Sequence, residues 1–210
     1  DCKTALFADD TAFFTSSRFA KTIIRILEKT VKKFANYCRR WKISLNHDKT
    51  QVIFFTNRRT KQLPVTPFKI NDININWEES DVKYLGMKLD KKLKFKNHID
   101  FIITKANNST KTLYSMLNRK SKLNIENKLL IYKAAIRPIL TYAAPVYKHT
   151  ANCHLKKLQV FQNKILRMIL NASWQTPTIE LHNLAKTPQV TEFIANISQT
   201  FEHKMNNLMV

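Results

Sequence analysis

Apolar residues recur at a helical spacing near the start of this chain, and this pattern constrains the fold more than any other feature. From position 20 the steps between them are four and three residues without a break, at Ala20, Ile24, Leu27, Val31, Phe34, Cys38 and Trp41. Residues three or four apart lie on the same face of an α-helix. The sequence therefore predicts a long amphipathic helix over residues 20–41 that covers another element with its apolar face.

Two short apolar runs precede this helix and enclose a pair of carboxylates. Residues 4–8 and 11–15 predict two β-strands, and Asp9 and Asp10 predict the turn that joins them into a hairpin. Aspartate is common in turns because it tolerates unusual backbone angles. Adjacent carboxylates on a rigid hairpin can also bind divalent cations. The pattern alone leaves both interpretations open.

The remaining sequence predicts a few strands followed by helices. Strands are expected over residues 51–56, 68–77 (with a tight turn at Asn71-Asp72) and 82–90. Helices are expected over residues 96–118, 124–147 (kinked or split at Pro138), 152–170 and 188–208. The predicted fold class is therefore α+β, with a small antiparallel sheet under one long helix and then a helical half. The change in composition near residues 91–96 predicts a domain boundary.

Gly86 is the only glycine among the 210 residues, and it falls inside the strand predicted over residues 82–90. A glycine within a strand commonly marks a β-bulge or a close approach of other atoms to the backbone. One of these two features is therefore expected at Gly86.

The chain carries a large excess of positive charge. Its 36 Lys and Arg residues outnumber 15 Asp and Glu residues, which gives a formal net charge of +21. A polyanionic partner is the simplest explanation of so much self-repulsion in a folded protein. Because the basic residues are spread along the chain, a groove or channel for nucleic acid is expected rather than a basic tail. For any single lysine, a cation that contacts only water is the alternative.

Several protein classes are disfavoured by the sequence. Three widely spaced cysteines, Cys2, Cys38 and Cys153, do not form a disulfide framework and favour an intracellular protein. The most apolar stretch, residues 129–147, contains two basic residues and two prolines, so a membrane span is not expected.

Two other groups of residues are interpreted structurally. The nearby His149, Cys153 and His154 lack a second paired half, so zinc binding is disfavoured. Tryptophan side chains are expected to pack within the fold rather than to stack on bases, although stacking stays open for the last of them, which lies in a polar segment: Trp41, Trp77 and Trp174.

Several motifs follow one another along the chain. FADD (residues 7–10) is followed by WKISLNHDKT (41–50), VKYLG (82–86), IYKAAIRPILTYAAPVY (131–147) and LQVFQNKILRMIL (158–170). In this order they resemble the reverse transcriptases of non-LTR retrotransposons, most closely those of jockey-like elements. That family carries Tyr-Ala-Asp-Asp on its hairpin, and here Phe7 replaces the tyrosine, which keeps the ring without the hydroxyl. The resemblance covers most of the chain.

The resemblance implies an architecture and an activity. Residues 1–90 would form the C-terminal part of a polymerase palm, residues 91–150 a helical thumb and residues 151–210 a helical extension. The activity would be RNA-directed DNA synthesis by the enzyme of a mobile element, in which two Mg²⁺ ions activate a primer 3′-hydroxyl. The partners would be an RNA template, a DNA primer, dNTPs and the rest of the polymerase chain.

The resemblance also assigns roles near the reaction centre. Asp9 would be a ligand of the catalytic metals, Asp10 would act less directly, and Phe7 would pack near the primer end. Lys49 would lie near the incoming triphosphate and protonate the leaving pyrophosphate, and Asn46 would shape its turn. The alternatives are a solvated cation for Lys49 and an ordinary turn residue for Asn46.

The primer and the duplex would be held by later residues. Three residues would hold the primer 3′ end, namely Tyr84, Leu85 and Gly86. The phosphate backbone of the template–primer duplex would contact clustered basic residues, namely Lys91, Lys92, Lys94, Lys96, Lys105, Lys111, Arg119, Lys120 and Lys122.

One departure from the family pattern bears on activity. The family uses a further aspartate on an upstream palm strand, together with fingers segments, and these 210 residues contain neither. The 210 residues alone are therefore expected not to polymerise DNA. A degenerate, non-catalytic remnant that binds nucleic acid through its basic surface is the alternative. A purely structural helical protein would leave both the charge and the hairpin unexplained. The sequence leaves the compartment open, the nucleus included.

Overall fold

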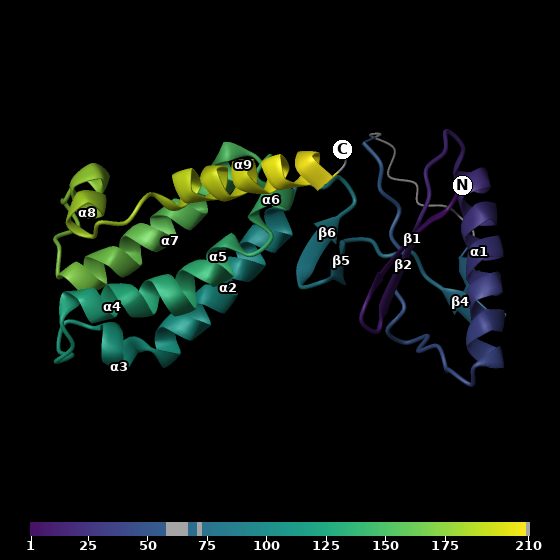
Figure 1. Ribbon diagram of the computed structural model, residues 1–210, viewed down its shortest axis with the longest axis horizontal. Coiled ribbons are helices and arrows are strands. Elements are labelled where there is room, and N and C mark those ends of the chain that lie inside the picture. Colours follow the sequence, from purple (N-terminus) through teal and green to yellow (C-terminus); the bar gives the residue numbers. More distant parts are fainter. Residues whose placement is uncertain (58–66, 71–72, 209–210) are drawn as a thin grey trace. The chain divides into compact units, whose positions relative to one another are not determined.

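The computed structural model describes residues 1–57, 67–70 and 73–208. The chain folds into two compact units (Figure 1). The N-terminal unit consists of residues 1–82 and 90–92, and the helical unit consists of residues 83–89 and 93–210. The structure combines helices with small two-stranded sheets, which agrees with the predicted α+β class.

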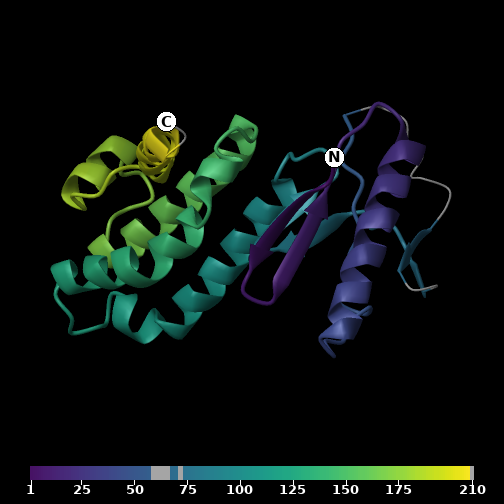
Figure 2. The ribbon, with the colours of Figure 1, turned by 45° about the vertical axis from the view of Figure 1, so that its right-hand side comes forward.

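The N-terminal unit is built on the predicted amphipathic helix, which is confirmed as α1 (Ala20–Arg40). The strands β1 (Lys3–Phe7) and β2 (Asp10–Phe14) form an antiparallel hairpin beside it (Figure 2). The ring of Phe13 meets the ring of Phe34 edge to face, with 5.2 Å between centroids. The hairpin is thereby fixed against α1 through one of its faces.

A second small hairpin completes the core of the N-terminal unit. The predicted strand over residues 68–77 forms β3 (Phe68–Ile70) and β4 (Ile73–Ile75), and its predicted turn at Asn71-Asp72 lies outside the described residues. Buried side chains of this unit cluster at Val31, Phe68, Ile70, Ile75 and Trp77. Trp77 therefore packs in the core, as expected.

The strand predicted over residues 51–56 is wrong. Val52 forms one isolated bridge with Trp77, and the amide of Thr56 donates a hydrogen bond to the carbonyl of Lys91 at 3.0 Å. The Val52 carbonyl also accepts a hydrogen bond from the amide of Glu78 at 2.8 Å. An apolar run becomes a strand only where a neighbouring strand pairs along its length, and residues 51–56 form no such ladder in the described structure.

The helical unit begins with a third hairpin and continues as helices. Its hairpin strands are β5 (Asp81–Tyr84) and β6 (Met87–Asp90), of which residues 81, 82 and 90 belong to the N-terminal unit. The helices are α2 (Lys96–Thr112), α3 (Tyr114–Leu117), α4 (Ile125–Ile131), the π-helical turn η1 (Tyr132–Ile136), α5 (Arg137–Thr141), α6 (Ala144–Tyr147), α7 (Asn152–Leu170), α8 (Thr178–Leu184) and α9 (Val190–Leu208).

The helix predicted over residues 124–147 is interrupted more often than expected. Pro138 lies in the first turn of α5 and Pro145 in the first turn of α6, where a missing amide proton costs no helical hydrogen bond. Between these helices Ala143 adopts a φ of +54°, which ends the helical path. The predicted helix over residues 96–118 is likewise divided, into α2 and α3.

One apolar core runs through the helical unit. Fully buried side chains come from α2, η1, α5 and α7, among them Ile99, Tyr132, Leu140 and Leu166. Figure 1 shows α2, α5 and α7 lying alongside one another, and α9 packs on α6 and α7. This core contains residues from both sides of position 150. The boundary between a thumb (residues 91–150) and an extension (residues 151–210) therefore stays a prediction.

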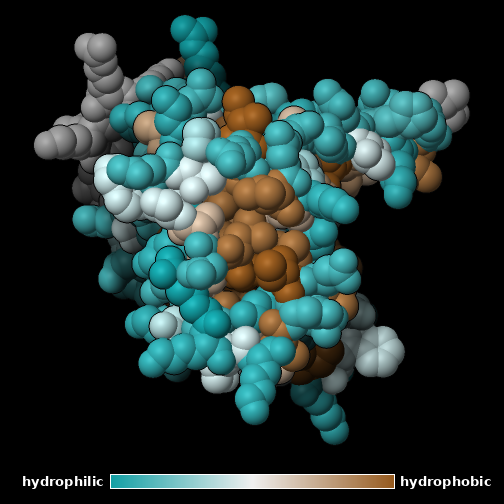
Figure 3. Space-filling model, turned by 90° about the vertical axis from the view of Figure 1, so that its left-hand side faces the viewer, coloured by the Kyte–Doolittle hydropathy of each residue, from teal (hydrophilic) through white to brown (hydrophobic). Residues whose placement is uncertain are grey.

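One face of the helical unit combines an apolar centre with a hydrophilic surround (Figure 3). Figure 3 looks at the side on which α7 and α8 lie in Figure 1, and shows apolar side chains gathered in the middle, with hydrophilic ones around them. Among the described helices, none has the length and apolar character needed to cross a membrane.

Candidate functional site

The paired carboxylates lie at the end of the β1–β2 hairpin, and the turn itself begins one residue earlier than predicted. Phe7 pairs with Asp10, so the two turn residues are Ala8 and Asp9. Ala8 adopts a φ of +52°, which allows the chain to reverse over only two residues. Asp10 is therefore the first residue of β2, and both carboxylates are exposed.

The register places Asp10 and Phe7 on the same face of the hairpin, because directly paired residues of antiparallel strands share a face. Phe13, three positions after Asp10, lies on the opposite face and contacts Phe34 of α1. Phe7 is 64% exposed, and Leu6 and Phe14 of the same hairpin are also exposed. The hairpin therefore carries exposed apolar side chains close to its carboxylates, and the carboxylates stay accessible to solvent.

Asp9 and Asp10 offer two adjacent carboxylates as possible metal ligands. Among the described residues, no ion pair joins either of them to a cation. The described part of the chain also contains no group of three or more His, Cys, Asp or Glu side chains placed to hold one metal. Carboxylate oxygens are the ligands that Mg²⁺ prefers, and it commonly takes one or two of them while keeping waters and phosphate oxygens. Two exposed carboxylates fit part of such a site.

Asn46 organises the turn that presents Lys49. The Asn46 Oδ1 atom accepts a hydrogen bond from the backbone amide of Lys49 at 3.1 Å, and the Thr50 hydroxyl donates to the Asn46 carbonyl at 2.8 Å. The amide of Thr50 also donates to the carbonyl of His47 at 3.1 Å. Lys49 itself is exposed, so its ammonium group is accessible to an anion.

Leu85 and Gly86 form the two-residue turn between β5 and β6. The single strand predicted over residues 82–90 is therefore wrong, and of the two features expected at Gly86 the bulge is not found. Both turn residues have positive φ angles, +45° for Leu85 and +77° for Gly86, as a tight hairpin requires. A close approach also occurs, because a Cβ atom on Gly86 would lie 3.3 Å from Cε1 of Tyr142.

The basic residues predicted to contact phosphates are nearly all exposed. Half-buried Lys91 is the exception, and the others are Lys92, Lys94, Lys96, Lys105, Lys111, Arg119, Lys120 and Lys122. Lys128, which the sequence did not single out, is buried. Its Nζ atom donates to the carbonyls of Asn118 at 2.8 Å and Ser121 at 3.3 Å. Lys128 therefore holds the loop that carries Arg119 and Lys120.

Two tryptophans are exposed: Trp41, which was expected to pack within the fold, and Trp174, for which base stacking was left open. Trp41 is 64% exposed, directly after α1, and Trp174 is 81% exposed in the loop after α7. Lys164 and Arg167 were not predicted from the sequence as functional residues. Their spacing could have indicated them, because residues 164, 167 and 168 lie on one face of α7.

Comparisons with known proteins point to one family. The family described as reverse transcriptase (RNA-dependent DNA polymerase) matches residues 1–89. The probable RNA-directed DNA polymerase from transposon X-element of Drosophila melanogaster is 29% identical over 201 residues, which are 96% of this chain. The RNA-directed DNA polymerase from mobile element jockey of the same species is 30% identical over 206 residues, which are 98% of this chain.

These relatives are much longer than the chain described here. A jockey polymerase of Drosophila funebris is 30% identical over 207 residues. In each of these three relatives, the match spans 22% of the relative's own length. No solved structure matches the chain at a significant level.

Proposed function

Because this chain belongs to the reverse transcriptases of jockey-like mobile elements, we propose that it forms part of an RNA-directed DNA polymerase. Residues 1–90 supply the C-terminal part of the palm, residues 91–150 supply the thumb, and residues 151–210 form a helical extension. The observation that carries the proposal is the pair of accessible carboxylates at the end of a rigid hairpin inside the segment that matches the family.

The hairpin provides carboxylate ligands for Mg²⁺ in this proposal. Two bound Mg²⁺ ions would lower the cost of the charge that develops as a primer 3′-hydroxyl attacks a nucleotide. Asp9, at the turn, holds one end of the metal site, and Asp10 contributes from the first position of β2. The remaining ligands come from polymerase residues outside this chain. Phe7 shares the face of Asp10 and packs near the primer end.

Lys49 and the β5–β6 turn act on the substrates. The exposed Lys49 ammonium binds the triphosphate and donates a proton to the leaving pyrophosphate. The Asn46 side chain fixes the turn that positions it. Tyr84, Leu85 and Gly86 hold the primer 3′ end, and catalysis then results mainly from positioning and charge neutralisation.

The basic residues between Lys91 and Lys122 that were named above bind the backbone of the template–primer duplex. Such contacts give affinity without reading sequence. RNA template, DNA primer and dNTPs are therefore the proposed partners, together with the rest of the polymerase.

Primer extension on a primed RNA template, with Mg²⁺ and dNTPs, tests the proposal in the complete polymerase. Asp9→Asn keeps the size of the side chain and removes its charge, so we expect a loss of at least about 100-fold in rate. Glu79→Gln is the matched control, because Glu79 is exposed and has no proposed role. Full activity of Asp9→Asn would overturn the assignment.

The same assay addresses the two alternatives. The 210 residues alone are expected to show no incorporation, because one hairpin supplies too few ligands to hold two Mg²⁺ ions. Clear incorporation would contradict this expectation. If the complete protein binds primed template but does not extend it, the chain is a nucleic-acid-binding remnant rather than an enzyme.

A further inference from the structure

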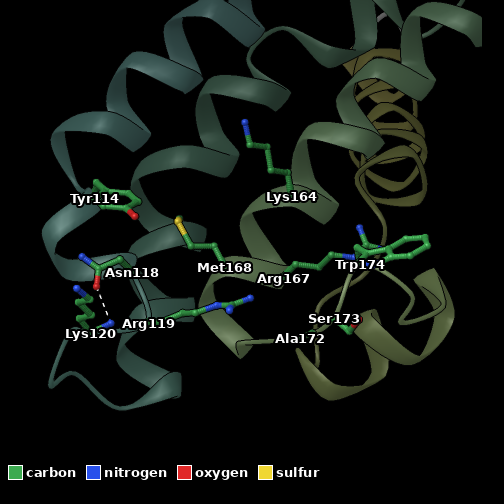
Figure 4. A pocket seen from close by; sticks show the side chains of 10 residues that line it. All are labelled: Tyr114, Asn118, Arg119, Lys120, Lys164, Arg167, Met168, Ala172, Ser173 and Trp174. Atoms are coloured by element: carbon green, nitrogen blue, oxygen red, sulfur yellow. Dashed lines mark hydrogen bonds between the residues drawn. The ribbon is translucent and has the colours of Figure 1, made fainter.

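A cavity of about 840 Å³ lies at one end of the helical unit, between α3 and the end of α7. One wall comes from α3 and the loop after it, and the other comes from the last turns of α7 and the loop before α8 (Figure 4). We call it the Trp174 pocket, and its lining residues are Tyr114, Asn118, Arg119, Lys120, Lys164, Arg167, Met168, Ala172, Ser173 and Trp174. Its volume is that of a small-ligand site, large enough for a nucleotide.

The lining of the Trp174 pocket carries charge of one sign. Four of its residues are cations and none is acidic. Between Asp100 and Glu180 the only carboxylate side chain in the sequence is that of Glu126. Within the part of the chain that the structure describes, no ion pair neutralises any of the four cations. The pocket is therefore complementary to a polyanion.

Hydrogen bonds hold both walls in place before any ligand binds. Asn118 Oδ1 accepts from the amides of Lys120 at 2.7 Å and Ser121 at 3.0 Å, and Lys128 fastens the same loop from beneath. On the other wall, Arg167 Nη2 donates to the carbonyl of Thr176 at 3.0 Å. Arg167 Nε has no partner among the described residues, so this guanidinium has more donors than the protein supplies acceptors for.

Two aromatic side chains in the same pocket are accessible. Trp174 is 81% exposed and Tyr114 is 56% exposed. Leaving most of an indole ring in water is unfavourable for the protein alone, and a nucleic-acid base stacks well on such a ring. Bases of a duplex are already stacked on one another, whereas an unpaired base can enter a concave site. An anionic membrane would meet the same charges and rings, but a flat lipid surface matches a hollow between two walls poorly.

We propose that the Trp174 pocket binds single-stranded nucleic acid, with a base stacked on Trp174 and phosphates held by Arg119, Lys120, Lys164 and Arg167. Arg119 and Lys120 are also among the basic residues proposed to contact the duplex backbone. No residue of the pocket has a role in the chemistry at Asp9, so the site can be tested separately from polymerisation. It also changes the interpretation of Trp174, which serves as a stacking surface rather than as a packing residue.

Fluorescence anisotropy of a labelled ten-nucleotide strand tests the site with the full 210-residue chain. Trp174→Ala is expected to weaken binding about 10-fold, and Trp174→Phe to retain most of the affinity because it keeps a ring. Trp41→Ala is the matched control, since Trp41 is also exposed but lies outside the pocket, and it is expected to bind as the wild type does. Circular dichroism confirms that each variant is folded.

Three further comparisons decide the nature of the ligand. A blunt duplex of the same length is expected to lose less than about 2-fold with Trp174→Ala. Binding to oligouridine and to oligothymidine is compared to show whether RNA or DNA is preferred. An affinity that depends on Trp174 for either strand supports the site. Wild-type binding by Trp174→Ala, an equal loss for the duplex, or a Trp174-dependent association with anionic vesicles in place of strands would each overturn the proposal.

Discussion

The hydroxyl of Tyr142 donates a hydrogen bond to the carbonyl oxygen of Leu85 at 2.8 Å, across 57 residues of sequence. The ring that carries this hydroxyl also lies against Gly86, where an added Cβ would come within 3.3 Å of it. Tyr142 sits between α5 and α6, at the break that the helix prediction did not place. The helices of this unit therefore hold the β5–β6 turn in place, which makes the turn a rigid platform.

Gly86→Ala is expected to destabilise the protein by about 1–2 kcal/mol, because a side chain is strained at a φ of +77°. The contact with Tyr142 adds to this cost. Urea unfolding followed by circular dichroism measures the change. Leu85→Asn is the matched control in the same turn: asparagine tolerates positive φ better than leucine, so no loss of stability is expected. An equal loss in both variants would contradict this account of the turn.

Acidification is expected to destabilise the protein through His98. Burial lowers the pKa of His98 below the ordinary value of 6.5, because the charged form loses its hydration. Its Nδ1 atom accepts a hydrogen bond from the amide of Lys88 at 3.3 Å, which requires that this nitrogen carry no proton. The unfolded chain therefore binds more protons than the folded chain between the lowered pKa and 6.5.

The contribution of His98 to stability is thus complete above pH 6.5 and decreases as the pH falls toward the lowered pKa. One group changes the free energy of unfolding by at most about 1.4 kcal/mol per pH unit. Urea unfolding at several pH values between 7.5 and 5 measures this slope. His98→Gln retains an acceptor for the Lys88 amide and cannot titrate, so its slope is expected to be smaller. Identical slopes for variant and wild type would exclude His98 as the cause.

Gln162→Ala is expected to cost about 1–3 kcal/mol, because it removes buried hydrogen bonds that join two helices. The Gln162 side chain is fully buried, accepts from the amide of Val190 at 2.6 Å and donates to the carbonyl of Pro188 at 3.0 Å. It thereby joins α7 to the start of α9. The Val190 amide also donates to Gln159 Oε1 at 3.0 Å, so the substitution removes the shorter of its two hydrogen bonds and the side-chain donor to the Pro188 carbonyl. Thermal or urea unfolding measures the loss. Asn183→Ala, at an exposed position of α8, is expected to stay within about 0.5 kcal/mol of the wild type.

Local patterns in the sequence predicted the elements whose signals lie within one short segment. The helix α1 follows from the spacing of its apolar residues, and the β1–β2 hairpin follows from two apolar runs around a polar turn. The exact turn was missed by one residue because Ala8, rather than an aspartate, takes the positive φ angle. Leu85 was missed as a turn residue for the same reason, since leucine rarely adopts such angles.

Features that depend on distant residues could not be predicted from local patterns. The segment around Val52 lacks full strand pairing within the described chain, although its apolar residues favour a strand. The Trp174 pocket brings together residues 114–120 and 164–174, whose proximity follows from helix packing alone. The exposure of Trp174 likewise depends on what the fold leaves uncovered.

The basic residues of the helical unit are expected to make nucleic-acid binding strongly dependent on salt. Each phosphate that a Lys or Arg neutralises releases counterions, so the logarithm of the binding constant falls linearly with that of the salt concentration. Replacing Lys105 and Lys111 of α2 together by Gln is expected to reduce this slope by about 1–2 on a primed duplex. Lys157→Gln is the matched control, because Lys157 already pairs with Asp100 at 2.6 Å. Titrations between 50 and 200 mM salt, a range over which such slopes are readily measured, test the prediction. An unchanged slope in the double variant would show that these two lysines contact water rather than phosphates.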